Sequence, residues 1–153
     1  MSTRVTNRPH KPYGPLHYGE AFVHHRGDEM NRSWIDDTVA AMPGTTVTPK
    51  PEWDSMLYHL QGKSMGMRGG YKDGRPILTI KLPPDQGEML RETHESIIPG
   101  YYSNKTHYNS VFLDAGLSRE FIMELLEDAW NCVFAALPKK TQAAMAAEMP
   151  DRA

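Results

Sequence analysis

The chain has 153 residues, enough for a single domain that buries a real core without disulfides or structural metal. Its 17 basic and 19 acidic residues leave a net charge of −2, so the composition lacks the basic excess that is usual in nucleic-acid-binding proteins. The single cysteine, Cys132, excludes an intramolecular disulfide and a cysteine-based zinc site, and it favours a reducing compartment.

The N-terminal segment differs in composition from the rest. Residues 1–29 contain three prolines and four of the seven histidines, and neither a helical nor a strand period fits them. We therefore expect a flexible N-terminal extension over 1–29 and a single domain over 30–149. No stretch approaches the ~18 apolar residues of a membrane span, and the chain begins without the apolar run of a signal peptide. These patterns predict a cytoplasmic protein with no membrane contact.

A helix and a series of hairpins are expected in the first half of the domain. Ser33 is a good N-cap, and an apolar stripe of helical period follows it until Pro43-Gly44. Alternating and extended stretches come next, and Gly-containing dipeptides predict the turns between them. The expected strands are 56–60, 64–70 and 76–82, with turns at Gln61-Gly62 and Asp73-Gly74.

The second half is predicted to contain three helices and two strands. Asp85 opens a short helix, and strands are expected at Ile97-Ile98 and at 108–113. From Ser118 the apolar residues follow a clear helical period, and a last, alanine-rich helix is expected from Pro138 to about Met149. Strands grouped in hairpins with helices around them favour an α+β fold over a parallel, doubly wound sheet.

One stretch carries a family resemblance. Pro99-Gly100-Tyr101 is followed by Asn104-Lys105-Thr106-His107 and an aromatic, and the long helix ends in Leu137-Pro138-Lys139-Lys140. With these motifs, residues from about 31 to 140 resemble the MmcQ/YjbR family, although Tyr108 stands where that family often has tryptophan. The resemblance implies an antiparallel sheet with β-hairpin wings, packed by an N-terminal helix, a short middle helix and a long C-terminal helix. It also implies DNA binding by a double wing, which is a fold analogy.

Basic residues gather on the predicted hairpins. Between residues 61 and 81 Asp73 is the single acid, and the bases are Lys63, Arg68, Lys72, Arg75 and Lys81. Basic hairpin tips suit phosphate contacts, because lysine and arginine release counterions there without a base-specific fit. The alternative is an ordinary solvated hairpin face. The exposed side of the long helix is acidic, so a helix-turn-helix mode is not expected.

A polar loop precedes the last strand. Asn104, Lys105 and His107 are flanked by tyrosines, and an amide, a cation and an imidazole among aromatics could hold a phosphate or a base. The alternative is structural, with Asn104 favouring the turn and His107 satisfying a backbone carbonyl. We expect Lys105 to be solvent-accessible and His107 to be at least partly buried.

The sequence predicts a binding protein, not an enzyme. We find no nucleophile elbow, P-loop or paired histidines at metal spacing, so no cofactor and no metal are expected. One hypothesis is weak, phosphate-directed binding of double-stranded DNA. The other is a protein-interaction adaptor with no nucleic-acid role, for which the ten methionines and the acidic helix argue. Trp53 is expected in or at the edge of the core, whereas an exposed Met65/Met67 face would indicate a partner surface.

Overall fold

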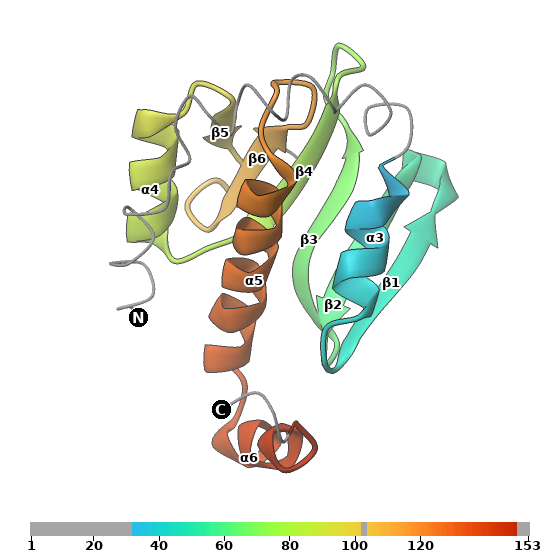
Figure 1. The fold of residues 1–153 in the computed structure, drawn as a ribbon, viewed down its shortest axis with the longest axis vertical. Helices are drawn as coiled ribbons and strands as arrows, with labels where there is room; N and C mark the ends of the chain where they lie inside the picture. Colours follow the sequence, from blue (N-terminus) through green and yellow to red (C-terminus); the bar gives the residue numbers. More distant parts are fainter. Residues whose placement is uncertain (1–31, 102–103, 150–153) are drawn as a thin grey trace.

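The structure, a computed structural model, describes residues 32–101 and 104–149, so the expected 1–29 extension lies outside the described residues. These residues form a six-stranded sheet accompanied by four α-helices (Figure 1). Every pair of neighbouring strands is antiparallel. The α+β class predicted from the sequence is therefore confirmed.

The strands follow one another along the sheet with a single exception, because β6 lies between β4 and β5. The order is β1-β2-β3-β4-β6-β5. The strands are β1 Thr45–Lys50, β2 Ser55–Leu60, β3 Lys63–Gly70, β4 Pro76–Lys81, β5 Ile97–Pro99 and β6 Tyr108–Phe112. The helices are α3 Ser33–Ala40, α4 Pro84–Thr93, α5 Arg119–Ala135 and α6 Lys139–Ala147, with a 3-10 turn η2 at Pro51–Trp53.

Helix α5 begins as its sequence predicts. Ser118 is the N-cap, and its hydroxyl accepts a hydrogen bond of 3.1 Å from the backbone N–H of Phe121. Helix α3 differs by one residue, because Arg32 is the N-cap and Ser33 is already helical. Both helices were thus predictable in place and length, and the capping residue was predictable only for α5.

Strand β1 is absent from the sequence prediction, which begins its strands at residue 56. The strand pairs with β2 from Thr45 opposite Leu60 to Lys50 opposite Ser55. Pro49 hides the strand in the sequence, since proline cannot donate to a ladder and is normally confined to sheet edges. β1 is an edge strand, so Pro49 is tolerated there.

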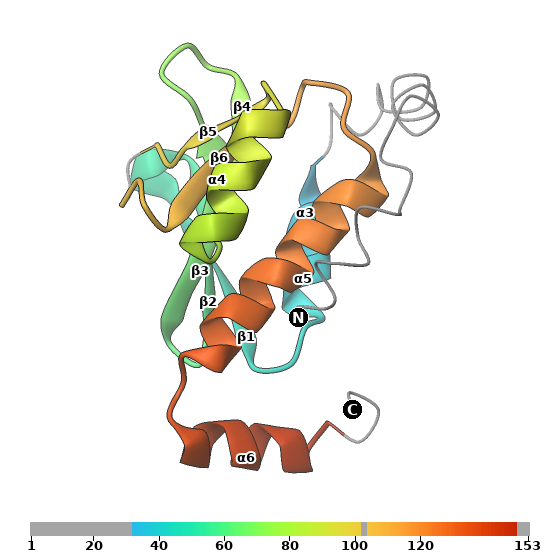
Figure 2. The same ribbon diagram turned by 90° about the vertical axis from the view of Figure 1, so that its left-hand side faces the viewer.

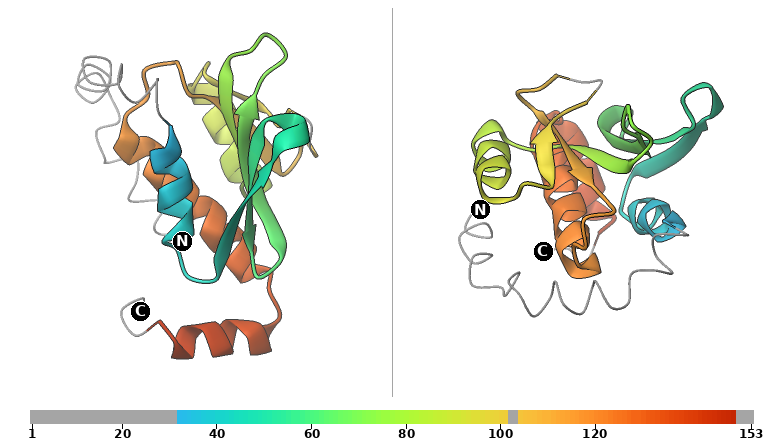
Figure 3. Two further views of the ribbon diagram at one scale, coloured as in Figure 1. Left: turned by 90° about the vertical axis from the view of Figure 1, so that its right-hand side faces the viewer. Right: turned by 90° about the horizontal axis from the view of Figure 1, so that it is seen from above.

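The core lies between one face of the sheet and two helices. α5 contacts β2, β3 and β4, and α3 contacts β1 and α5. Figures 2 and 3 show both helices on the same side of the sheet, with α4 beside β5 and β6. The predicted apolar face of α5 is buried, and it includes Phe121, Leu125, Ala129 and Val133. No α-helix of the described residues covers the opposite face of the sheet.

The two predicted hairpin turns lie at opposite ends of β3. Gln61 and Gly62, both with positive φ, join β2 to β3. At the other end Tyr71 and Arg75 close the β3–β4 turn through a backbone hydrogen bond of 2.8 Å. At about 3.3 Å per residue, β3 separates the turns by roughly 23 Å. The basic run of residues 61–81 is therefore divided between two ends of the sheet.

Candidate functional site

Arg68, predicted to bind phosphate, is held within the fold. Its guanidinium donates to the carboxylate of Asp36 on α3, with Nε–Oδ1 at 3.0 Å and Nη2–Oδ2 at 2.6 Å. The hydroxyl of Tyr58 donates to the same Oδ1 at 2.6 Å. Burial, together with the neighbouring Asp36 carboxylate, raises the pKa of Tyr58, so its hydroxyl stays a donor at neutral pH. This cluster joins α3 to the middle of the sheet.

Breaking the cluster should cost stability. Asp36→Ala leaves the guanidinium of Arg68 and the hydroxyl of Tyr58 without their acceptor, and the Asp36 and Arg68 side chains are only 13% and 25% exposed. We expect a loss of about 2–3 kcal/mol, somewhat below the cost of breaking a fully buried pair. Urea denaturation measures this loss. Asp37→Ala is the control, because that neighbouring side chain is exposed, and equal losses in the two variants would contradict the role of the cluster.

Arg75 also makes contacts within the fold. Its Nη2 lies 2.8 Å from Oδ1 of Asp114, and its guanidinium lies 3.9 Å from the centre of the Phe112 ring. The hydrogen bonds from Arg75 hold the pKa of Asp114 below its usual range. A lowered carboxyl pKa means that the pair stabilises the fold at neutral pH and that this contribution is lost as the pH falls through that pKa. Both predicted arginines thus have carboxylate partners.

The predicted lysines are placed differently. Among the described residues Lys63 and Lys81 have no hydrogen-bond or ion-pair partner, and Lys72 lies over the Tyr71 ring at 5.6 Å. Lys81 pairs across β4 and β6 with Tyr108, and Lys63 begins β3 at the same end of the sheet. Lys72 belongs to the turn at the other end. Lys63 and Lys81 therefore lie at the same end of the sheet, away from Lys72. They are on opposite faces, because Lys63 is the cross-strand partner of the core residue Leu60, whereas Lys81 alternates with the core residues Ile80 and Leu82.

The polar loop before β6 is built around a turn. The side-chain Oδ1 of Asn104 accepts from the backbone N–H groups of Thr106 and His107 at 2.8 and 3.2 Å. Asn104 thus takes the structural role that the sequence left open. As expected, Lys105 is exposed and His107 is half-buried, and Nζ of Lys105 donates to the carbonyl of Gly100 at 2.9 Å. We name Lys63, Lys81 and Lys105 the lysine end of the sheet.

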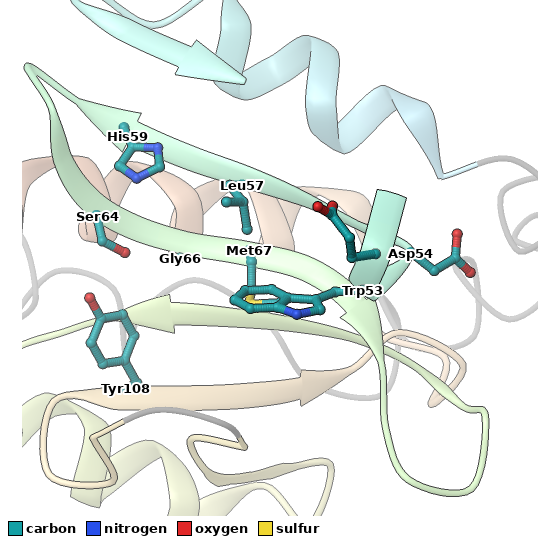
Figure 4. Close-up of a pocket in the computed structure, with 9 residues that line it drawn as sticks. Trp53, Asp54, Leu57, His59, Ser64, Gly66, Met67 and Tyr108 are labelled. Atoms are coloured by element: carbon teal, nitrogen blue, oxygen red, sulfur yellow. The ribbon is translucent and has the colours of Figure 1, made fainter. Parts of the chain in front are cut away.

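The helix-free face of the sheet holds a groove with a volume of about 770 Å³ (Figure 4). We call it the sheet groove. Its lining comes from η2 and the residue after it, from β2 and β3, and from the start of β6. The lining residues are Glu52, Trp53, Asp54, Leu57, His59, Ser64, Gly66, Met67 and Tyr108.

Strand alternation and one bulge place the floor of the sheet groove. Leu57 and His59 alternate along β2 with Tyr58 and Leu60, which are buried in the core. The register between β2 and β3 shifts at Tyr58/His59, so that one extra residue on β3 turns into the core. That residue is Met65, which is 1% exposed, and Gly66 beside it leaves the floor open.

Trp53 forms one wall of the sheet groove. Its side chain is 60% exposed, and Nζ of Lys50 lies 5.0 Å from the centre of the indole. The expectation that Trp53 is a core or core-edge residue is therefore wrong. Its immediate neighbours, Glu52 and Asp54, are acidic, and this short charged connection after a proline was the sequence signal for exposure. Met65 and Met67 do not form a shared exposed face. Met65 is buried in the core, and Met67 lines the groove.

The polar side chains of the sheet groove are available to a ligand. Ser64 and Tyr108 point toward each other from β3 and β6, and His59 lies near Ser64 (Figure 4). None of these three side chains has a hydrogen-bond partner among the described residues. Elsewhere on the same face, the hydroxyls of Thr79 and Ser110 bond to each other at 2.6 Å. The groove therefore has a hydroxyl and imidazole end next to Lys81, and an indole and carboxylate end next to Lys50.

The described ranges contain neither a metal-ligand cluster nor a membrane-spanning helix. In residues 32–101 and 104–149, no three histidine, cysteine, aspartate or glutamate side chains gather in a way that could hold a metal ion. No helix within those ranges is both long and apolar enough to cross a membrane.

Comparison with known sequences gives a consistent set of relatives. The family model YjbR matches residues 40–132, which include the whole sheet and its groove. The chain is 30% identical over 92 residues to the uncharacterised protein YbdF of Escherichia coli O157:H7, covering 60% of this chain and 73% of YbdF. It is 25% identical over 100 residues to the uncharacterised protein YjbR of Escherichia coli K12, covering 65% of this chain and 84% of that protein.

Solved structures have the same fold. The crystal structure of Deinococcus radiodurans protein DR2400, a DUF419 domain, matches 73% of this chain and 85% of its own with a TM-score of 0.64 and 25% identity. A Pseudomonas syringae protein matches 65% of this chain and 96% of its own with a TM-score of 0.54 and 24% identity. The Deinococcus protein is similar to this chain in both sequence and fold, and the Pseudomonas protein shows the fold alone.

Proposed function

We propose that this chain, which belongs to the YjbR family, binds DNA weakly and without sequence preference through the phosphate groups. The observation that carries the proposal is that the arginines and the lysines of the basic run differ in their partners. Arg68 and Arg75 pair with carboxylates, whereas Lys63 and Lys81 have no such partner among the residues described. Unpaired lysines can neutralise phosphates and release counterions. The proposed activity is binding without catalysis.

The lysine end is the proposed contact surface. The two hairpin turns lie at opposite ends of β3, so the contact surface is proposed at one end and not at both. Lys63, Lys81 and Lys105 lie at one end, where flexible ammonium groups suit a non-specific phosphate contact. Of the residues predicted from the sequence, Asn104 and His107 support this surface by shaping the loop that carries Lys105.

Affinity for duplex DNA should fall steeply with salt and depend on the lysine end. We expect Lys63→Glu combined with Lys81→Glu to weaken binding at least about tenfold at ~50 mM salt, and to reduce the log–log salt slope by about 2. Fluorescence anisotropy of a labelled duplex over a salt series measures both quantities.

The control variant combines Lys139→Glu and Lys140→Glu at the start of α6, where both side chains are exposed. It changes the net charge by the same amount away from the sheet. An equal loss of affinity in the control would show a general charge effect in place of a site. Absence of duplex binding at ~50 mM salt would remove the proposal.

A protein-interaction adaptor is the second candidate, and exposed apolar side chains favour it. Trp53 is 60% exposed, and Met123 on α5 is 42% exposed beside a shallow groove lined by Ala41, Met42 and Pro43. Soluble proteins rarely leave large apolar patches uncovered without a binding role. If no nucleic acid binds at low salt, these side chains become the surface to test against protein partners.

A further inference from the structure

We propose that the sheet groove binds one unpaired nucleotide, with the base against Trp53, Leu57 and Met67 and the phosphate at the end formed by Ser64, His59 and Tyr108. The inference deepens the proposed DNA binding, on which it rests where the nucleotide belongs to a strand. It names a single-stranded nucleotide as the preferred form of the ligand.

The indole end of the groove has the chemistry of a base site. An exposed tryptophan beside apolar side chains offers a stacking surface, which accepts any base because every base has a π-face. The side-chain carboxylates of Glu52 and Asp54 have no partner among the described residues, and carboxylates accept hydrogen bonds from the exocyclic amino group of a base such as cytosine. The same carboxylates repel phosphate, so they orient the ligand with its base at this end.

The opposite end has the chemistry of a phosphate site. The side chains of Ser64, His59 and Tyr108 converge there and make no hydrogen bond within the described part of the protein (Figure 4). Lys81 is the cross-strand partner of Tyr108 and lies on the same face of the sheet. Two hydroxyls and an imidazole can donate to phosphate oxygens, while Lys81 supplies positive charge.

The size and position of the groove select an unpaired nucleotide. A volume of about 770 Å³ is within the usual range of small-molecule sites and leaves room for a base with its sugar and phosphate. A base inside a duplex is stacked on both faces and cannot reach an aromatic side chain unless it is extruded. The groove should therefore discriminate between single strands and duplexes, which phosphate contacts alone do not.

The test compares ligands that differ only in their bases. Anisotropy is measured on the full chain with a labelled deoxycytidine 12-mer, an abasic 12-mer with the same number of phosphates, and a duplex. We expect the deoxycytidine strand to bind at least about tenfold more tightly than the abasic strand, since one stacked base supplies this much. Trp53→Ala should remove the difference and leave abasic binding unchanged. Met123→Ala, which also removes an exposed apolar side chain, should change nothing.

A second arm separates a free nucleotide from a strand and tests the phosphate end. Cytidine and cytidine monophosphate are titrated while the indole N–H signal of Trp53 is followed by NMR. The monophosphate should bind more tightly than the nucleoside, and Ser64→Ala should weaken only the monophosphate, because Ser64 is exposed and has no internal partner.

The outcomes distinguish this inference from the proposed function. Equal binding of the abasic and deoxycytidine strands would overturn the base site and leave phosphate-directed binding intact. Binding of the monophosphate without binding of any strand would support the groove and overturn DNA as its source. Failure of every nucleotide form to bind would overturn both.

Discussion

Replacing Gly66 by alanine is expected to cost on the order of 4 kcal/mol of stability or to prevent folding altogether. A Cβ at this position would lie 1.9 Å from the backbone oxygen of Thr79, and no side-chain rotation relieves a clash with backbone. The φ of Gly66 is also +150°, a conformation that L side chains rarely adopt. The β3–β4 pairing would have to open to admit the methyl group.

Gly70→Ala is the matched control, because nothing lies within 4 Å of the Cβ position there and the residue is at the end of β3. Soluble expression and thermal unfolding of the two variants give the comparison. A Gly66→Ala protein as stable as the Gly70→Ala protein would contradict the described β2–β3 bulge.

Leu125→Ala is expected to cost roughly 2–5 kcal/mol, the range found when a buried leucine is truncated in a well-packed core. Leu125 is 3% exposed and belongs to the face of α5 that packs on β2, β3 and β4. The sheet cannot close around the missing methyl groups without moving the helix, so part of the cost is the cavity. Chemical denaturation with an unchanged slope would measure the loss directly.

Met123→Ala serves as the control on the same helix, because its side chain is 42% exposed. We expect a change below ~0.5 kcal/mol there, as for surface substitutions in general. A loss of that small size at Leu125 would mean that the buried face of α5 has been assigned wrongly.

The sequence predicts elements whose signals are local. The cap at Ser118, the turn at Asp73-Gly74 and the alternation from Pro76 onward each lie within a few residues of what they determine. The structure confirms all three features. Strand β1 was missed because its strongest local signal, Pro49, argues against a strand unless the strand is known to be at an edge.

The partners of the arginines could not be predicted. Arg68 and Asp36 are 32 residues apart, and Arg75 and Asp114 are 39 apart. Charge counting along the chain treats each arginine as available to a ligand, whereas the fold brings a carboxylate to each of them. The lysines could be recognised as candidates, but their separation between two ends of β3 depends on strand length and order.

The candidate groove could not be predicted from the sequence for a similar reason. Its lining extends from Glu52 to Tyr108, and the hairpin that supplies most of it carries no motif that predicts a ligand site. Alternation shows that a strand has two faces without showing which face a helix covers, so the sequence alone could not place Leu57 and Met67 in a groove. Within the part of the chain that the structure describes, α3 and α5 lie on one face of the sheet and no α-helix covers the other.

Pro49 has a further consequence for how copies of the protein meet in solution. An edge strand presents unpaired backbone groups that can template the addition of a strand from a neighbouring molecule. In β1, which ends the sheet, an incoming strand would find the ring of Pro49 where it needs an N–H donor. A strand added at β1 would therefore lack the backbone hydrogen bond that Pro49 cannot donate, which disfavours edge-to-edge pairing at this position.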